Sequence, residues 1–85
     1  MEKLRLDNNQ ISDINILEKV NFKELKVLDL YNNNISEIKV LEKVKFEKLE
    51  KLNLSENKIL NIDILENVNF KELKILYLSS IIYQI

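Results

Sequence analysis

The side chains that could carry out chemistry in this 85-residue chain are carboxylates, with a few serines and tyrosines. Asp7 with Asp13, or Asp29 with Glu37, could be imagined as acid and base partners. No recognisable motif places a base to activate the serines at 79 and 80. Histidine, cysteine and glycine are absent, which removes the commonest general base, thiolate chemistry and glycine-rich phosphate loops. We therefore expect a protein that is not an enzyme and that holds neither a metal nor a cofactor.

Charge and hydropathy restrict the classes of partner. The chain has 13 basic and 14 acidic side chains and a net charge of −1, so no long-range field attracts phosphate backbones or anionic lipid. It has no apolar run long enough to span a bilayer and no recognisable secretory leader. The sequence therefore predicts an intracellular, cytoplasmic location and a protein partner, with no binding to nucleic acid or membranes.

The chain is built on one repeating period of 24 residues, and each unit reads LxLxxNxIxxIxxLxxVxFxxL. We divide a single domain, residues 1–85, into units 1–24, 25–48, 49–72 and a partial unit 73–85. The in-register positions include Leu4, Leu28, Leu52 and Leu76; Leu6, Leu30, Leu54 and Leu78; Asn9, Asn33 and Asn57; and Phe22, Phe46 and Phe70.

The segments LRLDNNQI, LDLYNNNI and LNLSENKI resemble the LxLxxNxL segment of the leucine-rich repeat family. The spacing IxxIxxL after the asparagine is similar to the isoleucine-rich intracellular subclass that includes a regulatory subunit of protein phosphatase. This resemblance implies an α/β solenoid, a right-handed horseshoe segment that binds its partner on the concave strand face.

The spacing of the residues supports the same fold. Two leucines separated by one residue point to one side of an extended segment, which predicts a short strand with one buried face. Four such segments with long returns between them predict a concave parallel sheet of about four strands. Leu17 and Val20 lie three apart, as on one face of a helical or 3₁₀ turn on the convex side. Asn15 with Glu18, and Asp63 with Glu66, resemble capping boxes at the start of these turns.

Two sets of repeated side chains are predicted to stack inside the solenoid. The asparagine amides can donate to and accept from the backbone of neighbouring coils, so we expect a structural ladder rather than a ligand site. The phenylalanines are expected to form an aromatic spine inside the outer edge rather than a cofactor site. The ladder consists of Asn9, Asn33 and Asn57, and the spine of Phe22, Phe46 and Phe70.

The side chains that remain exposed on the strands form the predicted partner-binding face. Four of them are apolar or aromatic where solubility alone favours polar groups, and aromatic groups are enriched in binding hot spots. The alternative is that valine, isoleucine and tyrosine simply favour strands. The predicted face comprises Lys3, Arg5, Val27, Asp29, Tyr31, Lys51, Asn53, Ile75 and Tyr77, with Asp7, Ser55 and Ser79 in the same outward columns.

The ends of the repeat array suggest an alternative function. Solenoids need capping units, and neither end of this sequence shows one. The apolar tail Ile81, Ile82, Tyr83 and Ile85 is a candidate self-association segment, and Ile81 stands where the ladder asparagine is expected. The chain is then a fragment of a longer array, or its tail folds back as a cap, or it forms homo-oligomers through open ends. A protein-binding scaffold is the first hypothesis, a structural or self-assembling module the second, and a small-ligand site in the concavity a remote third.

Overall fold

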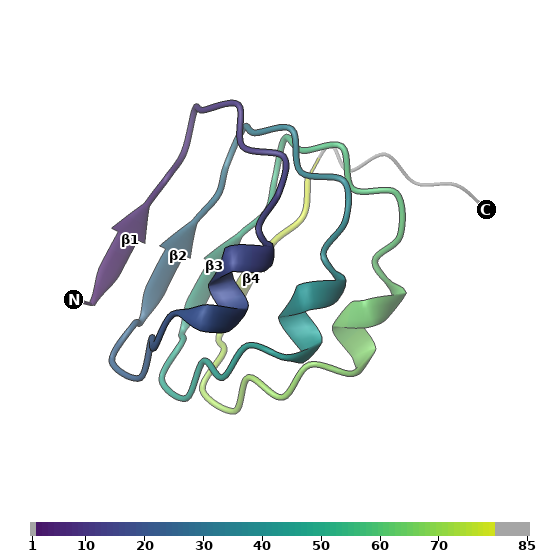
Figure 1. Ribbon diagram of the computed structural model, residues 1–85. Helices are drawn as coiled ribbons and strands as arrows, with labels where there is room; N and C mark the ends of the chain where they lie inside the picture. The colour runs from purple at the N-terminus through teal and green to yellow at the C-terminus, as the bar shows by residue number, and fades with distance from the viewer. Residues whose placement is uncertain (1, 80–85) are drawn as a thin grey trace.

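The computed structural model describes residues 2–79, which fold into four short strands joined by three return paths (Figure 1). Four parallel strands form one sheet in the order β1-β2-β3-β4, and paired residues are 24 positions apart, as in Leu4 with Leu28. This confirms the predicted solenoid of parallel strands. The elements are β1 Lys3–Arg5, η1 Asn15–Lys19, β2 Val27–Asp29, η2 Lys39–Glu42, β3 Lys51–Asn53, η3 Asp63–Glu66 and β4 Ile75–Tyr77, where η marks a 3₁₀ turn.

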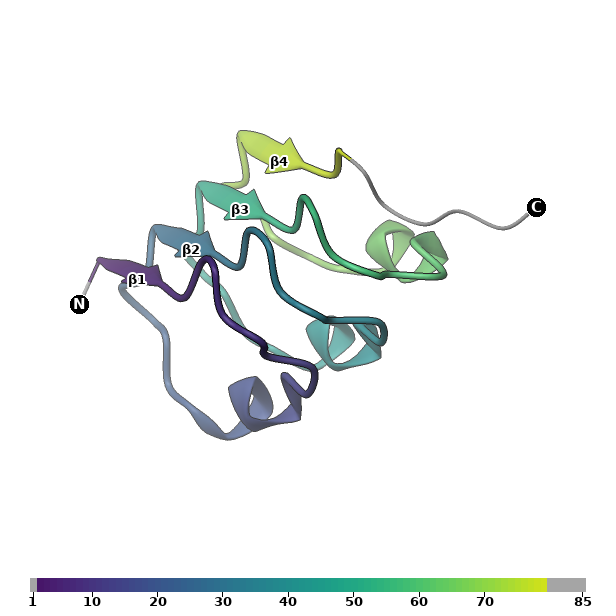
Figure 2. The same ribbon diagram turned by 90° about the horizontal axis from the view of Figure 1, so that it is seen from above.

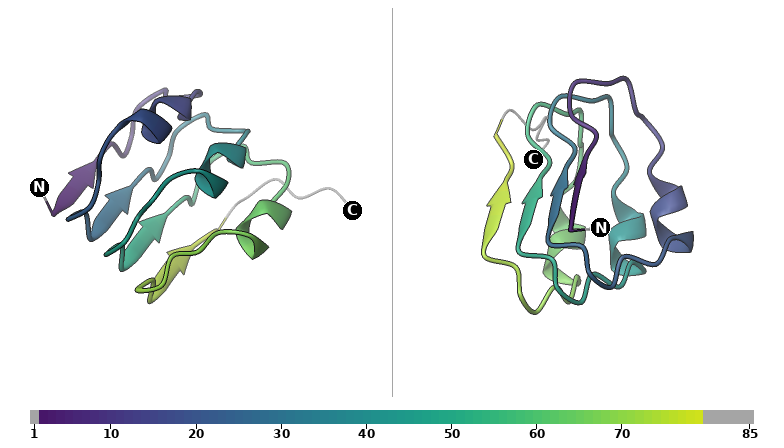
Figure 3. Two further views of the ribbon diagram at one scale, coloured as in Figure 1. Left: turned by 60° about the horizontal axis from the view of Figure 1, so that its bottom comes forward. Right: turned by 90° about the vertical axis from the view of Figure 1, so that its left-hand side faces the viewer.

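The leucines of the strands fix this arrangement because alternate side chains point to opposite faces of a strand. Leu28 and Leu52 are fully buried on the inner side, while their neighbours in sequence face outward. The return paths fan apart behind the closely paired strands, so the strand side is the concave face of the stack (Figure 2). The 3₁₀ turns η1, η2 and η3 lie behind the sheet (Figure 3).

The aromatic spine lies within this core. The ring centroids of Phe22 and Phe46 are 5.6 Å apart, and those of Phe46 and Phe70 are 5.4 Å apart. The first pair is tilted by 35° and the second is close to edge-on at 65°, both favourable arrangements for aromatic rings. Phe46 is buried between the other two rings, so it links the three coils.

The expected capping boxes of Asn15 with Glu18 and Asp63 with Glu66 do not form. No side chain caps any of the three 3₁₀ turns from the residue that precedes it, because that residue is in each case an isoleucine directed into the core. The acceptor comes instead from the side chain one position earlier. These bonds join Asp13 Oδ1 to the Asn15 amide at 2.9 Å, Glu37 Oε1 to the Lys39 amide at 2.9 Å, and Asn61 Oδ1 to the Asp63 amide at 2.8 Å.

Apolar side chains of the first coil are less buried than their equivalents in the second coil. Val20, which we expected to share a buried face with Leu17, is 43% exposed, whereas Val44 one unit later is 8% exposed. The reason is position in the stack, because Val44 has coils on both sides and Val20 has a neighbouring described coil on one side only. Leu4, Leu6 and Ile11 are half-buried for the same reason.

Ion pairs connect neighbouring coils along the rim. Glu2 lies 3.3 Å from Lys26, Glu24 lies 3.0 Å from Lys48, and Glu50 lies 3.7 Å from Lys74. The hydrogen bond and the positive charge of Lys48 lower the pKa of the Glu24 carboxyl, and the same contact raises the pKa of the Lys48 ammonium group. Exposed pairs of this kind contribute little to stability, but they favour opposite charges on adjacent coils.

The turn after each of the first three strands requires a left-handed backbone conformation. Asn8, Asn32 and Glu56 have φ values of 58°, 56° and 57°. Asparagine tolerates this conformation because its short side chain bonds locally, and Asn32 Nδ2 donates to Asn8 Oδ1 at 2.9 Å. The longer glutamate side chain does not bond locally in this way, so Glu56 is the strained one of these three residues.

We therefore predict that Glu56→Asn stabilises the protein. The gain should be about 0.5 to 1 kcal/mol, a fraction of the roughly 1–2 kcal/mol that the left-handed conformation costs an ordinary residue. Urea denaturation measures it, and Glu47→Asn, an exposed substitution outside the left-handed positions, is the control. A variant no more stable than the parent would show that the turn holds no strain at Glu56.

Candidate functional site

The parallel register brings the predicted partner-binding residues together in columns across the concave face. Lys3 pairs with Val27, Val27 with Lys51, and Lys51 with Ile75. The next outward column runs in the same way through Arg5, Asp29, Asn53 and Tyr77. Residues far apart in the sequence thus share one surface.

The most exposed apolar and aromatic groups of this surface lie on and beside β2 and β4. Tyr31 is 39% exposed, and Ile75 and Tyr77 are each 43% exposed. Val27 is half-buried beside them. Lys51, on the intervening strand, places its Nζ atom 5.4 Å from the centre of the Tyr77 ring, a cation–π contact that holds the ring on the face.

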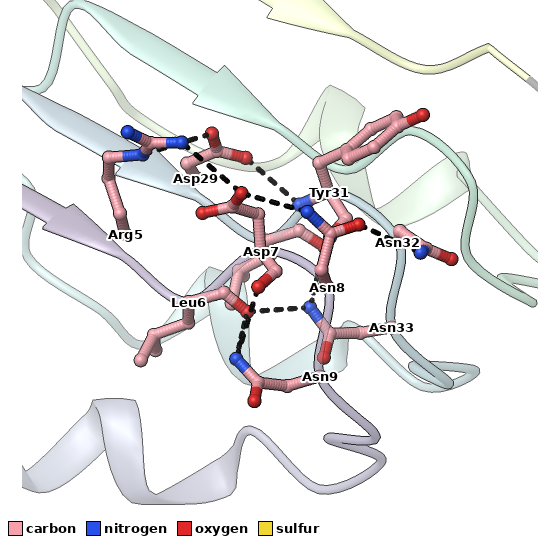
Figure 4. A network of polar contacts seen from close by, with 10 residues as sticks. Arg5, Leu6, Asp7, Asn8, Asn9, Asp29, Tyr31, Asn32 and Asn33 are labelled. Atoms are coloured by element: carbon pink, nitrogen blue, oxygen red, sulfur yellow. Dashed lines mark hydrogen bonds and ion pairs between the residues drawn. The ribbon is translucent and has the colours of Figure 1, made fainter.

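A polar cluster occupies the opposite end of the concave face, near β1 (Figure 4). Arg5 lies 3.2 Å from the carboxylate of Asp7 and 4.0 Å from that of Asp29. Asn8 Nδ2 also donates to Asp7 at 3.1 Å. The charge of Arg5 is therefore matched by two carboxylates, whereas no ion pair within residues 2–79 involves Lys3 or Lys51.

Three side chains on this face have structural partners that the sequence did not predict. Asp29 accepts the Tyr31 amide, and Asn53 accepts the Ser55 amide, each at 3.0 Å. Ser55, which we expected to be exposed, is 3% exposed. Its small side chain lies between the neighbouring coils, and its Oγ accepts the Ser79 amide at 3.0 Å. These three residues maintain the ends of the strands.

The asparagine ladder lies at the turns that follow the strands. Asn57 Nδ2 is within hydrogen-bonding distance of the carbonyls of Leu30, Leu54 and Ser55, and its Oδ1 accepts the Ile35 amide at 3.1 Å. Asn33 makes the equivalent contacts with the first and second coils. Asn9 is exposed and donates only to carbonyls of its own unit, those of Leu6 and Asp7. A second column, Asn8 and Asn32, could have been recognised from the asparagines that precede the ladder position.

Several hollows lie away from the predicted site, among the return paths. Five hollows of about 320 to 650 Å³ lie among the return paths, and none of these five is lined by an outward-facing strand residue. The largest has Phe46 in its wall, with Lys43, Lys45, Glu42 and Glu47 around it. The predicted partner-binding face therefore lies outside these five hollows.

Neither a metal-binding cluster nor a membrane-spanning helix occurs in the part of the chain that the structure describes. Within residues 2–79, no group of three or more metal-binding side chains is close enough to hold an ion. No described helix has the length and apolar character needed to cross a membrane. The predicted self-association segment, Ile81, Ile82, Tyr83 and Ile85, lies outside the described residues.

Parallel strands joined through 3₁₀ turns, with leucines inside and an asparagine ladder at the turns, define a leucine-rich repeat solenoid. Comparison with family models agrees with this class: residues 1–43 match the model for two copies of Leucine Rich repeats, and residues 48–69 match the model for a single Leucine Rich Repeat. The chain belongs to the leucine-rich repeat family. No curated protein matches it. Domains of this family are generally protein–protein interaction modules and are typically not enzymes.

The ladder supports a quantitative prediction because its members differ in burial. Asn57→Ala leaves the Leu54 carbonyl and the Ile35 amide without a partner, and each unsatisfied group costs about 1–3 kcal/mol. We expect a loss of at least about 2 kcal/mol in the free energy of unfolding, measured by urea denaturation. Asn9→Ala is the matched control and should cost less than about 1 kcal/mol, since water can replace its exposed bonds. Equal losses for both variants would contradict a ladder that acts between coils.

Proposed function

We propose that this protein is a scaffold that binds a protein partner through its concave strand face. The observation that carries the proposal is the exposure of Tyr31, Ile75 and Tyr77 together on one side of the sheet. Tyrosine is favoured at interfaces because it offers a large, rigid apolar surface and a hydroxyl that can bond to the partner. The general role of the family in protein–protein interaction supports the same conclusion.

The distribution of charge indicates how a partner would lie. Lys51 is flanked on its own column by Val27 and Ile75, so a cation stands within an apolar surface. Arg5 is already matched by Asp7 and Asp29. A partner segment with apolar side chains and a carboxylate near Lys51 would complement this half of the face, while the β1 half would provide polar contacts.

Cross-linking from the concave face tests the proposal and identifies the partner in one step. A photoreactive amino acid at Asn53, in the centre of the sheet, should cross-link a partner from the cell of origin, and the same group at Lys39, on the convex side, should not. The partner identified in this way is then purified for affinity measurement by calorimetry.

We predict that Tyr31→Ala combined with Tyr77→Ala weakens binding of that partner at least roughly tenfold, because two aromatic hot spots are removed. The variant Ile16→Ala with Leu60→Ala is the matched control, since it removes exposed apolar groups that lie outside the strands, at 63% and 52% exposure. It should leave the affinity unchanged. The opposite pattern, loss of binding in the control alone, would place the interface on the return paths.

A further inference from the structure

We propose that the outer edge of β4 in one molecule pairs with the outer edge of β1 in a second copy, so that chains stack head to tail. Within residues 2–79 these two strands form the opposite edges of the sheet (Figure 3). Unpaired strand edges present backbone donors and acceptors to a further strand. This surface is distinct from the concave face, so the inference does not depend on the proposed function.

The sequence contains a second period, twice as long as the first. Residues 20–26 and 68–74 are both VNFKELK, whereas the unit between them has VKFEKLE at 44–50. Residues 2–4 and 50–52 are both EKL. First and third coils therefore share one charge pattern, the second coil carries the reverse pattern, and the fourth coil shares a lysine with the second, Lys74 at the position of Lys26. Within the chain, every described junction joins coils of different pattern.

A head-to-tail contact continues this alternation. The rim column Glu2, Lys26, Glu50 and Lys74 changes sign at every coil, and a following Glu2 of a second copy would stand beside Lys74. We take the junction between the second and third coils as the template for this contact. There Lys26 of one coil is followed by Glu50 of the next, and the Glu50 amide donates to the Lys26 carbonyl at 2.8 Å. A symmetric contact of two β1 edges would instead bring together Lys3 of both copies, which has no ion pair within residues 2–79, and like-charge repulsion disfavours this.

The template also specifies the hydrogen bonds of the contact. In the chain, the Lys26 carbonyl accepts the Glu50 and Lys51 amides, and the Leu30 amide donates to the Asn53 carbonyl. By the same register, the Lys74 carbonyl would accept the Glu2 and Lys3 amides of the second copy, and the Leu78 amide would donate to its Arg5 carbonyl. All of these residues lie in the described part of both edges.

Side chains at each edge lack contacts that the opposite edge of a second copy would supply. Asn33 and Asn57 donate to carbonyls of the preceding coil, those of Leu6 and Leu30, and Asn9 has no described preceding coil. In the stack, Asn9 of the second copy would reach the Leu78 carbonyl. Leu4 and Leu6 are half-buried and Leu76 is 36% exposed, whereas Leu28 and Leu52 between coils are fully buried. Pairing the edges would cover these leucines.

The first experiment uses the absence of cysteine from the chain. With oxidised glutathione as the oxidant, a Lys3→Cys variant mixed with an Ile75→Cys variant should form a disulfide. Strands paired in register lie about 4.8 Å apart, within the roughly 4.4–6.8 Å that a disulfide spans. The control mixes Lys3→Cys with Tyr77→Cys, two residues out of register and about 8 Å away, and should cross-link at least about tenfold more slowly. Equal rates, or preferential linkage of Lys3→Cys to itself, would overturn the proposed register.

The second experiment interrupts the edge while keeping the fold. The Val27 and Lys51 amides donate to the preceding coil, so the equivalent Lys3 amide points away from β2. Lys3→Pro removes this outward donor at the first residue of a strand, where proline is tolerated. Light scattering of the full 85-residue chain over three decades of concentration should show a mass that rises for the parent and for Lys3→Ala but stays monomeric for Lys3→Pro. A monomeric parent, or a rising mass in Lys3→Pro, would refute edge pairing.

Discussion

The structure depends on one constraint: each turn after a strand bends the backbone inward and leaves polar groups facing the core. A buried amide or carbonyl without a partner is costly. Direct backbone bonds between neighbouring turns, such as that from the Asn32 amide to the Ser55 carbonyl at 3.0 Å, satisfy only part of these groups. The asparagine side chain solves this because it both donates and accepts. Asn57 bonds to the backbone of its own turn and to that of the preceding one, so adjacent coils are joined at the place where the sheet ends.

This constraint also fixes the register of the strands. An asparagine that must bond to the carbonyl 27 positions earlier, as Asn57 does to Leu30, allows no slippage between coils. The leucines then meet the leucines of the next coil, and the phenylalanines meet at ring distances of 5.4 to 5.6 Å. Hydrophobic burial provides the driving force, while the ladder selects one alignment among those that burial alone would accept.

The sequence predicted the fold well because a repeated spacing constrains all coils at once. It predicted the 3₁₀ turns but placed their caps on Asn15 and Asp63, since capping rules for longer helices assume that the capping side chain is free. Here the preceding isoleucines are part of the core, and Asp13, Glu37 and Asn61 supply the bonds. Ser55 was assigned to the surface because strand alternation alone takes no account of the neighbouring coils, which bury its small side chain. The hollows among the return paths had no signal in the sequence, since they arise where coils fan apart.

The two proposed interaction surfaces lie at right angles, and this affects how they would combine. Stacking extends the sheet along the solenoid axis, while a partner on the concave face lies across the strands, so neither contact covers the other. A stack would place Lys3 of a second copy beside Ile75, and Arg5 beside Tyr77, repeating the arrangement of Lys51 between Val27 and Ile75. The apolar half of one concave face would then continue into the polar half of the next. A long partner could contact several copies, and the gain would come from linked binding rather than from new contacts within one chain.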